Sequence, residues 1–452
     1  MLYHADFGTY RTIPVATPEM GVAMCPCGKV HTADIGEVIV GAGTVKLLPE
    51  ILARYGAKKP FILCDVNTWQ AAGEYVYDEL IEAGYPCGKY VFPQKALEPD
   101  AHAVGAAVMH YDHSCDIIIG VGSGVINDIG KILSRTTGRK YIIVGTAPSM
   151  DGYASATSSM SLDGLKVSLP SRCADVIIGD TNILKHAPAH MLSAGLGDML
   201  AKYVSIAEWR IAHIITGEYY CERVAQDIRN ALDKCVRNAE GLLARDEEAV
   251  EAVFEGLVMG GIAMAYAGVS RPASGVEHYF SHVWDMRGLA LGTPVDLHGI
   301  QCAIATYEAV KLYERMAAIT PDKEKALAHA AAFSFEDWAE QLRTFVGAGA
   351  EAMIAQEAKE GKYDKAKHAA RLEIILDRWE DILAIMREEL PAAQRIAALL
   401  DTLHIEKTPD YLGVDRDKAR MTFRATKDIR DKYVLSRLAW DLGVMEEVCA
   451  AM

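Results

Sequence analysis

Three residues that lie far apart in the chain have side chains that could bind one metal ion together: Asp198, His278 and His298. One carboxylate and two imidazoles form a mixed oxygen and nitrogen ligand set that suits divalent zinc, iron or nickel. Three protein ligands leave a coordination position open, and an open position acts as a Lewis acid on a substrate oxygen. We therefore treat these residues as a candidate catalytic metal site.

The residues around the first histidine place two histidines on one helix face. His278 and His282 are four positions apart, and side chains at i and i+4 are neighbours on a helix. In the zinc-protease motif a glutamate directly follows the first histidine, whereas here Glu277 precedes it. This order excludes a metalloprotease of that type. Ordinary packing or solvent-facing roles for the 14 histidines stay open as the alternative.

A glycine-rich loop upstream, from Gly120 to Lys131, indicates a bound dinucleotide. It follows a predicted strand and opens a predicted helix, whose N-terminal N–H groups and dipole favour a pyrophosphate. The standard fingerprint needs a glycine where Val125 stands and an acid about twenty residues further on, where Ile142 stands. The acid that could bind a ribose is instead Asp65, after the second predicted strand. A tight turn without a ligand is the alternative.

A second polar segment, Gly145 to Ser155, follows the fifth predicted strand. Small hydroxyl residues and glycines at the carboxyl end of a strand suit hydrogen bonding to phosphate or sugar. The same residue types are equally typical of a capped turn.

Strand and helix patterns alternate through the part of the chain that carries both polar segments. Apolar, β-branched runs predict strands at 37–40, 60–64, 89–92, 116–120 and 140–144. Amphipathic segments between them predict helices at 45–55, 71–83, 99–111 and 125–134. Strands separated by helices of this length predict a parallel sheet with helices on both faces, and ligands of such sheets bind at the carboxyl ends of the strands.

The pattern changes after about Ala187, where long helical stretches rich in Ala, Leu and Glu replace the strand runs. They cover 197–215, 218–244, 247–267 and much of 322–400. The sequence therefore predicts a Rossmann-like α/β domain that binds the dinucleotide (residues 1–187). An all-helical domain that binds metal and substrate follows it (residues 188–452).

Composition narrows the class of protein. The 452-residue chain carries a net charge of −15, which argues against a nucleic-acid partner because phosphate backbones need clustered Lys and Arg. Its ten cysteines are scattered, as is typical of reduced thiols in the cytoplasm. We see no basic start with an apolar stretch typical of a signal peptide, and no apolar run near the ~20 residues of a membrane helix. We expect a cytoplasmic enzyme without a membrane partner.

One group of cysteines could form a small zinc clip: Cys25 and Cys27, with His31 after them. The cysteines are separated by one residue, whereas zinc knuckles use two to four, and no second pair follows at finger spacing. A turn in an N-terminal hairpin is the preferred interpretation.

Four segments together resemble one branch of a known superfamily. They are the loop 120–131, the run 146–155, Gly197-Asp198 with Lys202, and the run from Ser270 to His282. The candidate ligands are also spaced appropriately, with 80 positions from Asp198 to His278 and 20 from there to His298. The chain resembles the sn-glycerol-1-phosphate dehydrogenase branch of the iron-containing alcohol dehydrogenase and dehydroquinate synthase-like superfamily.

The resemblance implies roles for individual residues. The metal ligands would be Asp198, His278 and His298. The residues near the substrate would be Asp151, Asp198 and His282, of which Asp198 and His282 would be catalytic. The dinucleotide site would comprise Gly122, Ser123, Gly124, Asp128, Thr146, Ser149 and Ser155, with Asp65 near the adenosine ribose. Ser123 and Asn127 depart from the branch, which has Gly and an apolar residue there.

The resemblance also implies an activity: reduction of dihydroxyacetone phosphate to sn-glycerol 1-phosphate, with one divalent ion (zinc, nickel or iron). We expect NADH to be preferred and NADPH to be usable, because Asp65 would accept from a ribose 2′-hydroxyl and repel a 2′-phosphate. Candidates for binding the substrate phosphate are the segment 149–159, Lys202 and Arg271. We expect a homo-oligomer, a dimer or larger.

Other functions remain open from the residues alone. A glycerol dehydrogenase would use the same site on an unphosphorylated substrate. A carbon–oxygen lyase like dehydroquinate synthase would use the dinucleotide as a transient oxidant, although the metal carboxylate there is usually Glu. A non-catalytic binding protein that kept the fold is the third alternative.

Overall fold

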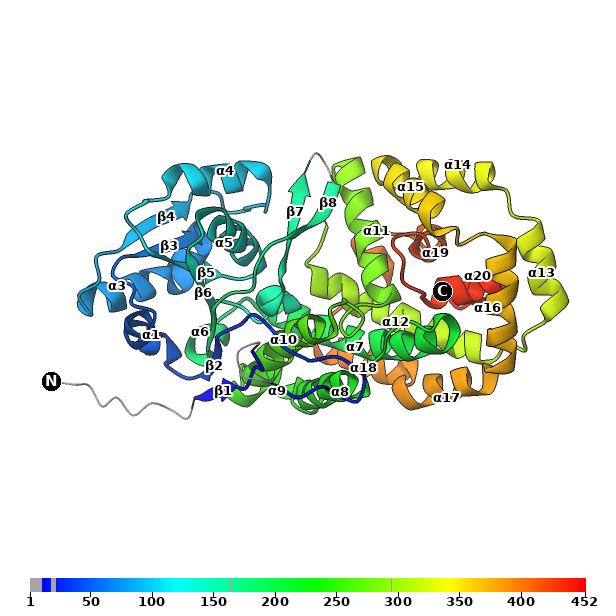
Figure 1. Ribbon diagram of the computed structural model, residues 1–452, viewed down its shortest axis with the longest axis horizontal. Coiled ribbons are helices and arrows are strands. Elements are labelled where there is room, and N and C mark those ends of the chain that lie inside the picture. Colours follow the sequence, from blue (N-terminus) through cyan, green and yellow to red (C-terminus); the bar gives the residue numbers. More distant parts are fainter. Residues whose placement is uncertain (1–9, 18–21, 163–164, 294) are drawn as a thin grey trace. The chain divides into compact units, whose positions relative to one another are not determined.

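The computed structural model describes residues 10–17, 22–162, 165–293 and 295–452 (Figure 1). It divides into two compact units, residues 1–199 with 230–268, and residues 200–229 with 269–452. Two helices, α7 (Ala189–Thr216) and α8 (Glu222–Arg237), run without a break from one unit into the other. The assignment of residues 1–187 and 188–452 to separate functional domains stays a prediction.

The first unit contains a seven-stranded sheet in the order β1-β2-β9-β6-β5-β3-β4. All neighbouring strands pair in parallel except β1, which is antiparallel to β2. The strands are β1 (Arg11–Ile13), β2 (Glu37–Gly41), β3 (Pro60–Asp65), β4 (Gly88–Phe92), β5 (Ile117–Gly122), β6 (Lys140–Gly145) and β9 (Val176–Asp180), and β7 (Thr157–Leu162) and β8 (Leu165–Pro170) form a separate hairpin. All five predicted strands are present, as β2 to β6.

Helices lie on both faces of this sheet, as predicted (Figure 1). The helical segments are η2 (Thr44–Leu47), α1 (Leu48–Arg54), α2 (Val66–Thr68), η3 (Trp69–Gly73), α3 (Glu74–Glu82), α4 (Ala101–His110), α5 (Gly124–Thr137), η4 (Asp151–Ala154), α6 (Thr181–Leu184), α9 (Ala239–Leu242) and α10 (Glu247–Ala267).

Alternate residues of each strand pack on opposite faces of the sheet. Ile62 and Ile119 join α1 and α3 in one buried cluster. On the other face, a Cβ at Gly145 or Gly179 would lie 2.8 or 2.3 Å from the ring of Phe254 on α10. Glycine at these strand positions therefore allows α10 to pack directly against the sheet.

Strand β9 was missed by the sequence analysis, although its five residues are all buried and it lies between β2 and β6. The pattern of Val176-Ile177-Ile178 predicts a strand. The strand was not predicted because the hairpin β7–β8, rather than a helix, precedes it. The hairpin interrupts the alternation of strand and helix on which the prediction depended.

The second unit is helical within the described residues, which agrees with the predicted change of pattern. Its further helices are α11 (Val276–Leu291), α12 (His298–Ala317), α13 (Lys323–Ala331), α14 (Phe335–Val346), η5 (Gly347–Gly349), α15 (Ala350–Glu360), α16 (Lys365–Asp377), α17 (Trp379–Glu389), α18 (Ala393–Thr402), η6 (Pro409–Leu412), α19 (Arg416–Thr426), α20 (Leu435–Asp441) and α21 (Met445–Cys449).

Two parts of the helical stretch for which the sequence offered no role, α14 and the loop before α16, contact the segment between α19 and α20. The buried carboxylate of Asp428 accepts hydrogen bonds from Trp338 Nε1 at 2.9 Å and from the Tyr363 hydroxyl at 2.6 Å. Lys427 and Arg437 form ion pairs with the same carboxylate. Because buried charges are stable only when they are paired and hydrogen-bonded, these contacts hold the chain in place at Asp428, directly after α19.

Among the described residues one helix, α10, is long and apolar enough to cross a membrane by length and composition alone, so the expectation that no apolar run approaches that length was wrong. Of its apolar window, 72% is buried inside the protein, where it contributes to the core of the first unit.

Candidate functional site

The predicted dinucleotide residues lie at the ends of three neighbouring parallel strands, β3, β5 and β6. The strand register pairs Leu63 with Gly120 and Gly122 with Gly145. Asp65 ends β3, the glycine loop follows β5, and Thr146 follows β6. The structure therefore brings these three segments to one edge of the sheet, where ligands of parallel sheets bind.

Glycine stands at different positions of the loop for different structural reasons. A Cβ at Gly120 or Gly130 would lie 2.4 Å from the buried Tyr141 hydroxyl, so both are needed for α5 to pack on the sheet. A Cβ at Gly122 would lie 2.5 Å from Ile126, which makes this glycine necessary for the strand-to-helix turn. At Gly124 the nearest atom would be 3.4 Å away, an ordinary contact. Of these four glycines, Gly124 is the one that the protein's own packing does not require.

The first turns of α5 hold the hydroxyl-rich segment after β6. Asn127, which stands where the resemblance predicts an apolar residue, donates from Nδ2 to the Gly152 carbonyl at 3.0 Å. The buried Lys131 ammonium donates to the Thr157 carbonyl at 2.5 Å and pairs with Asp128 at 2.9 Å. Asp128, a predicted dinucleotide residue, thus also neutralises the lysine that fixes this segment.

Other predicted dinucleotide residues take local structural contacts as well. Asp65 Oδ1 accepts from the backbone N–H groups of Asn67 and Thr68, each at 2.8 Å, and caps α2. Ser123 is the N-cap residue of α5, and Ser149 is buried. Ser155 lies 2.9 Å from the Thr157 hydroxyl. A ribose at Asp65 would therefore use the second carboxylate oxygen, Oδ2.

The three predicted metal ligands converge, together with a fourth residue. Ligand atoms of Asp198, His278, His298 and Cys302 all lie within 4.8 Å of one another. Asp198 is fully buried on α7, the helix that continues unbroken into the second unit. The backbone N–H of Asp151, a predicted substrate residue, donates to Asp198 Oδ2 at 3.0 Å.

A buried carboxylate sets the orientation of His278. His278 Nδ1 donates to Glu277 Oε1 at 2.9 Å, so Nε2 is the nitrogen whose lone pair can bind a metal. Glu277 Oε1 also accepts from the Gly275 N–H at 2.6 Å, and glycine is required there because a Cβ would lie 2.7 Å from Glu277 Oε2. Burial, and then the negative charge of Glu277, raise the pKa of the neighbouring Glu208.

Cys302 was not predicted as a member of this group. It lies one turn beyond His298 on α12, with Sγ 3.5 Å from His298 Nε2, while the Ser281 hydroxyl lies 3.0 Å from His298 Nδ1. The i, i+4 spacing of His298 and Cys302 was the available signal. A lone cysteine in an apolar helix carries little information by itself, because free cysteine is commonly a core residue.

His282 and two basic residues lie close to the histidine pair. The ring centroid of His282 is 6.3 Å from that of His298. Burial, and then the charge of Arg430, lower the pKa of His282 well below its usual value, and Lys432 acts in the same direction. Burial lowers the pKa of Lys432 itself to about 7. Sequence analysis missed both cations, because single basic residues usually lie on solvated surface.

The cations that were predicted to bind phosphate are both buried. Arg271 donates from Nε and Nη2 to the two oxygens of Glu218, each at 2.6 Å, and from Nη1 to the Tyr433 carbonyl at 2.9 Å. These bonds occupy its guanidinium, so its observed role is structural. Lys202 is fully buried on α7.

Comparison with known proteins defines the class first. Residues 39–188 match the iron-containing alcohol dehydrogenase family. The chain is similar in structure to a glycerol dehydrogenase from Schizosaccharomyces pombe, with a TM-score of 0.58, 17% identity, and coverage of 91% of this chain and 89% of that one. At this identity the likeness shows the fold alone.

Two curated relatives narrow the class. The glycerol-1-phosphate dehydrogenase [NAD(P)+] of Halalkalibacterium halodurans is 33% identical over 65% of this chain and 74% of its own. That of Geobacillus thermodenitrificans is 28% identical over 86% of this chain and 88% of its own. The chain belongs to the glycerol-1-phosphate dehydrogenase family, within the iron-containing alcohol dehydrogenases.

Replacing Glu277 by Gln tests the orientation of His278. Glutamine keeps the shape and an acceptor but removes the charge that makes the imidazole a stronger ligand. We expect metal affinity to fall by about 10- to 100-fold, as is typical when such a partner is changed. Competition with a chelator would measure it. Glu308→Gln, at a buried carboxylate of α12 paired with Lys311, is the matched control. Equal affinity in Glu277→Gln and in the unmodified protein would contradict the role.

Proposed function

We propose that this protein reduces dihydroxyacetone phosphate to sn-glycerol 1-phosphate with a reduced nicotinamide dinucleotide and one divalent metal ion. The observation that carries the proposal is the convergence of one carboxylate and two imidazoles, with an oriented His278, in a member of the glycerol-1-phosphate dehydrogenase family. The donor set fits zinc, nickel or iron equally well.

Asp198, His278 and His298 would hold the ion, and Asp198 would also position the substrate. A bound ion supplies Lewis-acid polarisation of the substrate carbonyl, and the reduced dinucleotide supplies the hydride. Glu277 keeps His278 in the tautomer that can act as a ligand. The sulfur of Cys302 would line the site, because a fourth protein ligand would close the position that the substrate needs.

The dinucleotide would bind at the strand edge formed by β3, β5 and β6. Gly124 allows the backbone to approach the pyrophosphate at the start of α5, and Gly122 shapes the turn. The remaining contacts would come from Asp65, Ser123, Asp128, Thr146, Ser149 and Ser155.

The substrate would meet Asp151, Asp198 and His282. Because its pKa is depressed, His282 is neutral near pH 7, so it can hydrogen-bond the substrate and pass a proton from water without holding a charge. Arg430, which acts electrostatically on His282, is our candidate for binding the phosphate, because the Lys432 ammonium already donates to the Ser274 carbonyl at 2.7 Å. Homo-oligomerisation and a cytoplasmic location stay predictions.

The substrate assignment can be tested by offering dihydroxyacetone phosphate and dihydroxyacetone side by side and by determining the stereochemistry of the product. We expect higher kcat/KM on the phosphate ester and an sn-1 product. Removing the guanidinium in Arg430→Ala should raise KM for the phosphate ester by about tenfold or more, since a hydrogen bond to a charged group contributes about 1.5–3 kcal/mol.

The control for that variant is Arg378→Ala, at an exposed arginine paired with Asp381 on α17. Its KM and kcat/KM for either substrate should be unchanged. Higher efficiency on the unphosphorylated ketone would favour a glycerol dehydrogenase. Turnover of a sugar-acid phosphate without net NADH consumption would favour the lyase. An sn-3 product would contradict the proposed facial selectivity.

Dinucleotide preference tests the role of Asp65. We expect NADH to be preferred, and Asp65→Asn to narrow the NADH-to-NADPH ratio of kcat/KM by about tenfold, because the amide no longer repels a 2′-phosphate. Asparagine preserves the cap on α2, so the fold should not change. Asp100→Asn, which alters the corresponding cap of α4, is the control. An unchanged ratio would place Asp65 away from the ribose.

A further inference from the structure

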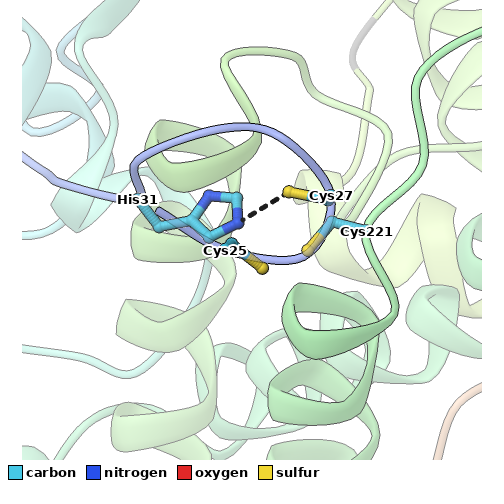
Figure 2. A group of neighbouring side chains, drawn as sticks. All are labelled: Cys25, Cys27, His31 and Cys221. Carbon is cyan, nitrogen blue, oxygen red and sulfur yellow. Dashed lines mark hydrogen bonds between the residues drawn. The ribbon is translucent and has the colours of Figure 1, made fainter. Parts of the chain in front are cut away.

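A second group of ligand atoms lies away from the candidate catalytic site. Cys25, Cys27 and His31 come from the connection between β1 and β2, and Cys221 immediately precedes α8 (Figure 2). One ligand atom from each of the four residues lies within 4.8 Å of all the others. The sequence showed three of these residues, but Cys221 is almost two hundred positions further on and could not be associated with them by spacing.

A tight turn places the first two sulfurs on the same side of the chain. The Gly28 N–H donates to the Cys25 carbonyl, and the Cys25 N–H to the Lys29 carbonyl, each at 2.8 Å. Gly28 has φ of +85°, a conformation that side chains disfavour. This is the turn expected from the sequence, and it lies in the connection between two antiparallel strands. It brings together two thiols separated by one residue.

His31 is oriented as a metal ligand. Its Nδ1 lies 2.8 Å from the Tyr266 carbonyl on α10, and because a carbonyl only accepts, the proton is on Nδ1. The lone pair of Nε2 therefore faces the sulfurs, with Cys27 Sγ at 3.3 Å (Figure 2). Metal-bound histidines characteristically donate their second nitrogen to a carbonyl or carboxylate in this way.

The arrangement fits the size of a tetrahedral zinc site. Bonds of about 2.3 Å to sulfur and 2.0–2.1 Å to nitrogen require ligand atoms ~3.5–3.8 Å apart, so small side-chain shifts suffice. Three of the four residues are buried, with exposed fractions of 6% for Cys25, 5% for His31 and 1% for Cys221. Three thiolates and one imidazole are also the soft ligand set that selects zinc over harder ions.

We propose that Cys25, Cys27, His31 and Cys221 form a structural zinc site with four protein ligands and no open position. The ion would tie the β1–β2 connection to the start of α8. The same connection is held to α10 through His31 and through the Lys29 ammonium, which donates to the Ala267 carbonyl at 2.9 Å. Cys221 directly precedes α8, the helix that continues unbroken into the first unit.

The test uses the full chain, purified and loaded with cobalt(II) alone as the probe. Thiolate ligation gives cobalt an intense sulfur-to-metal charge-transfer band, which the carboxylate and histidines of the catalytic group do not produce. We expect this band in the unmodified protein and in Cys302→Ser. In Cys27→Ser and Cys221→Ser we expect the band to disappear and the bound metal to fall by one equivalent per chain. Cys87→Ser, at a half-buried cysteine outside the group, is the matched control. It should keep the charge-transfer band and the full metal content.

A measurement on the unmodified protein covers the case in which the variants fail to fold. With zinc bound, Cys25, Cys27 and Cys221 should resist alkylation and become reactive when a chelator is added. Equal alkylation with and without chelator, a disulfide between two of these cysteines, or a charge-transfer band that disappears only in Cys302→Ser would each overturn the proposal. Because none of these measurements depends on turnover, failure here is distinct from failure of the proposed reaction.

Discussion

The hydrogen bond from His278 Nδ1 to Glu277 is the interaction on which the candidate catalytic site depends. It determines which nitrogen faces Asp198 and His298, and it increases the basicity of that nitrogen. The Glu277 carboxylate is buried at a cost that only its hydrogen bonds offset. Burial, and then the charge of Glu277, also raise the pKa of the neighbouring Glu208. Gly275 is necessary because no side chain fits between these groups and the backbone.

The remaining structure supplies rigid supports for this arrangement. Helix α7 carries Asp198, α11 carries His278 and His282, and α12 carries His298, so each ligand is fixed by a helix. Helix α14 and the loop before α16 hold Asp428 through Trp338 and Tyr363, and the chain that follows Asp428 carries Arg430 and Lys432. This part of the helical stretch therefore supports the chain that carries the two cations influencing His282.

Local sequence patterns predicted the elements of the fold and the types of ligand. They could not predict contacts between residues that are distant in the sequence. The strands β2 to β6 follow from apolar runs between helices, but β9 was hidden because a hairpin precedes it. Asp198, His278 and His298 were predicted as ligands from their residue types and the family resemblance, and their ligand atoms do lie together. Cys302, Cys221 and Arg430 were missed because each acquires its meaning only from a neighbour that folding brings near. Arg271 was proposed for phosphate because its pairing with Glu218 cannot be read from the sequence.

Anomalous X-ray scattering from crystals of the metal-loaded protein tests the central claim most directly. We predict a peak about 2.0–2.2 Å from a carboxylate oxygen of Asp198 and from a ring nitrogen of each of His278 and His298, with no bond to Cys302. Such a site keeps a position open for the substrate. A fourth bond to the Cys302 sulfur would close the site and contradict a catalytic role, and absence of a peak between these residues would contradict the metal site itself.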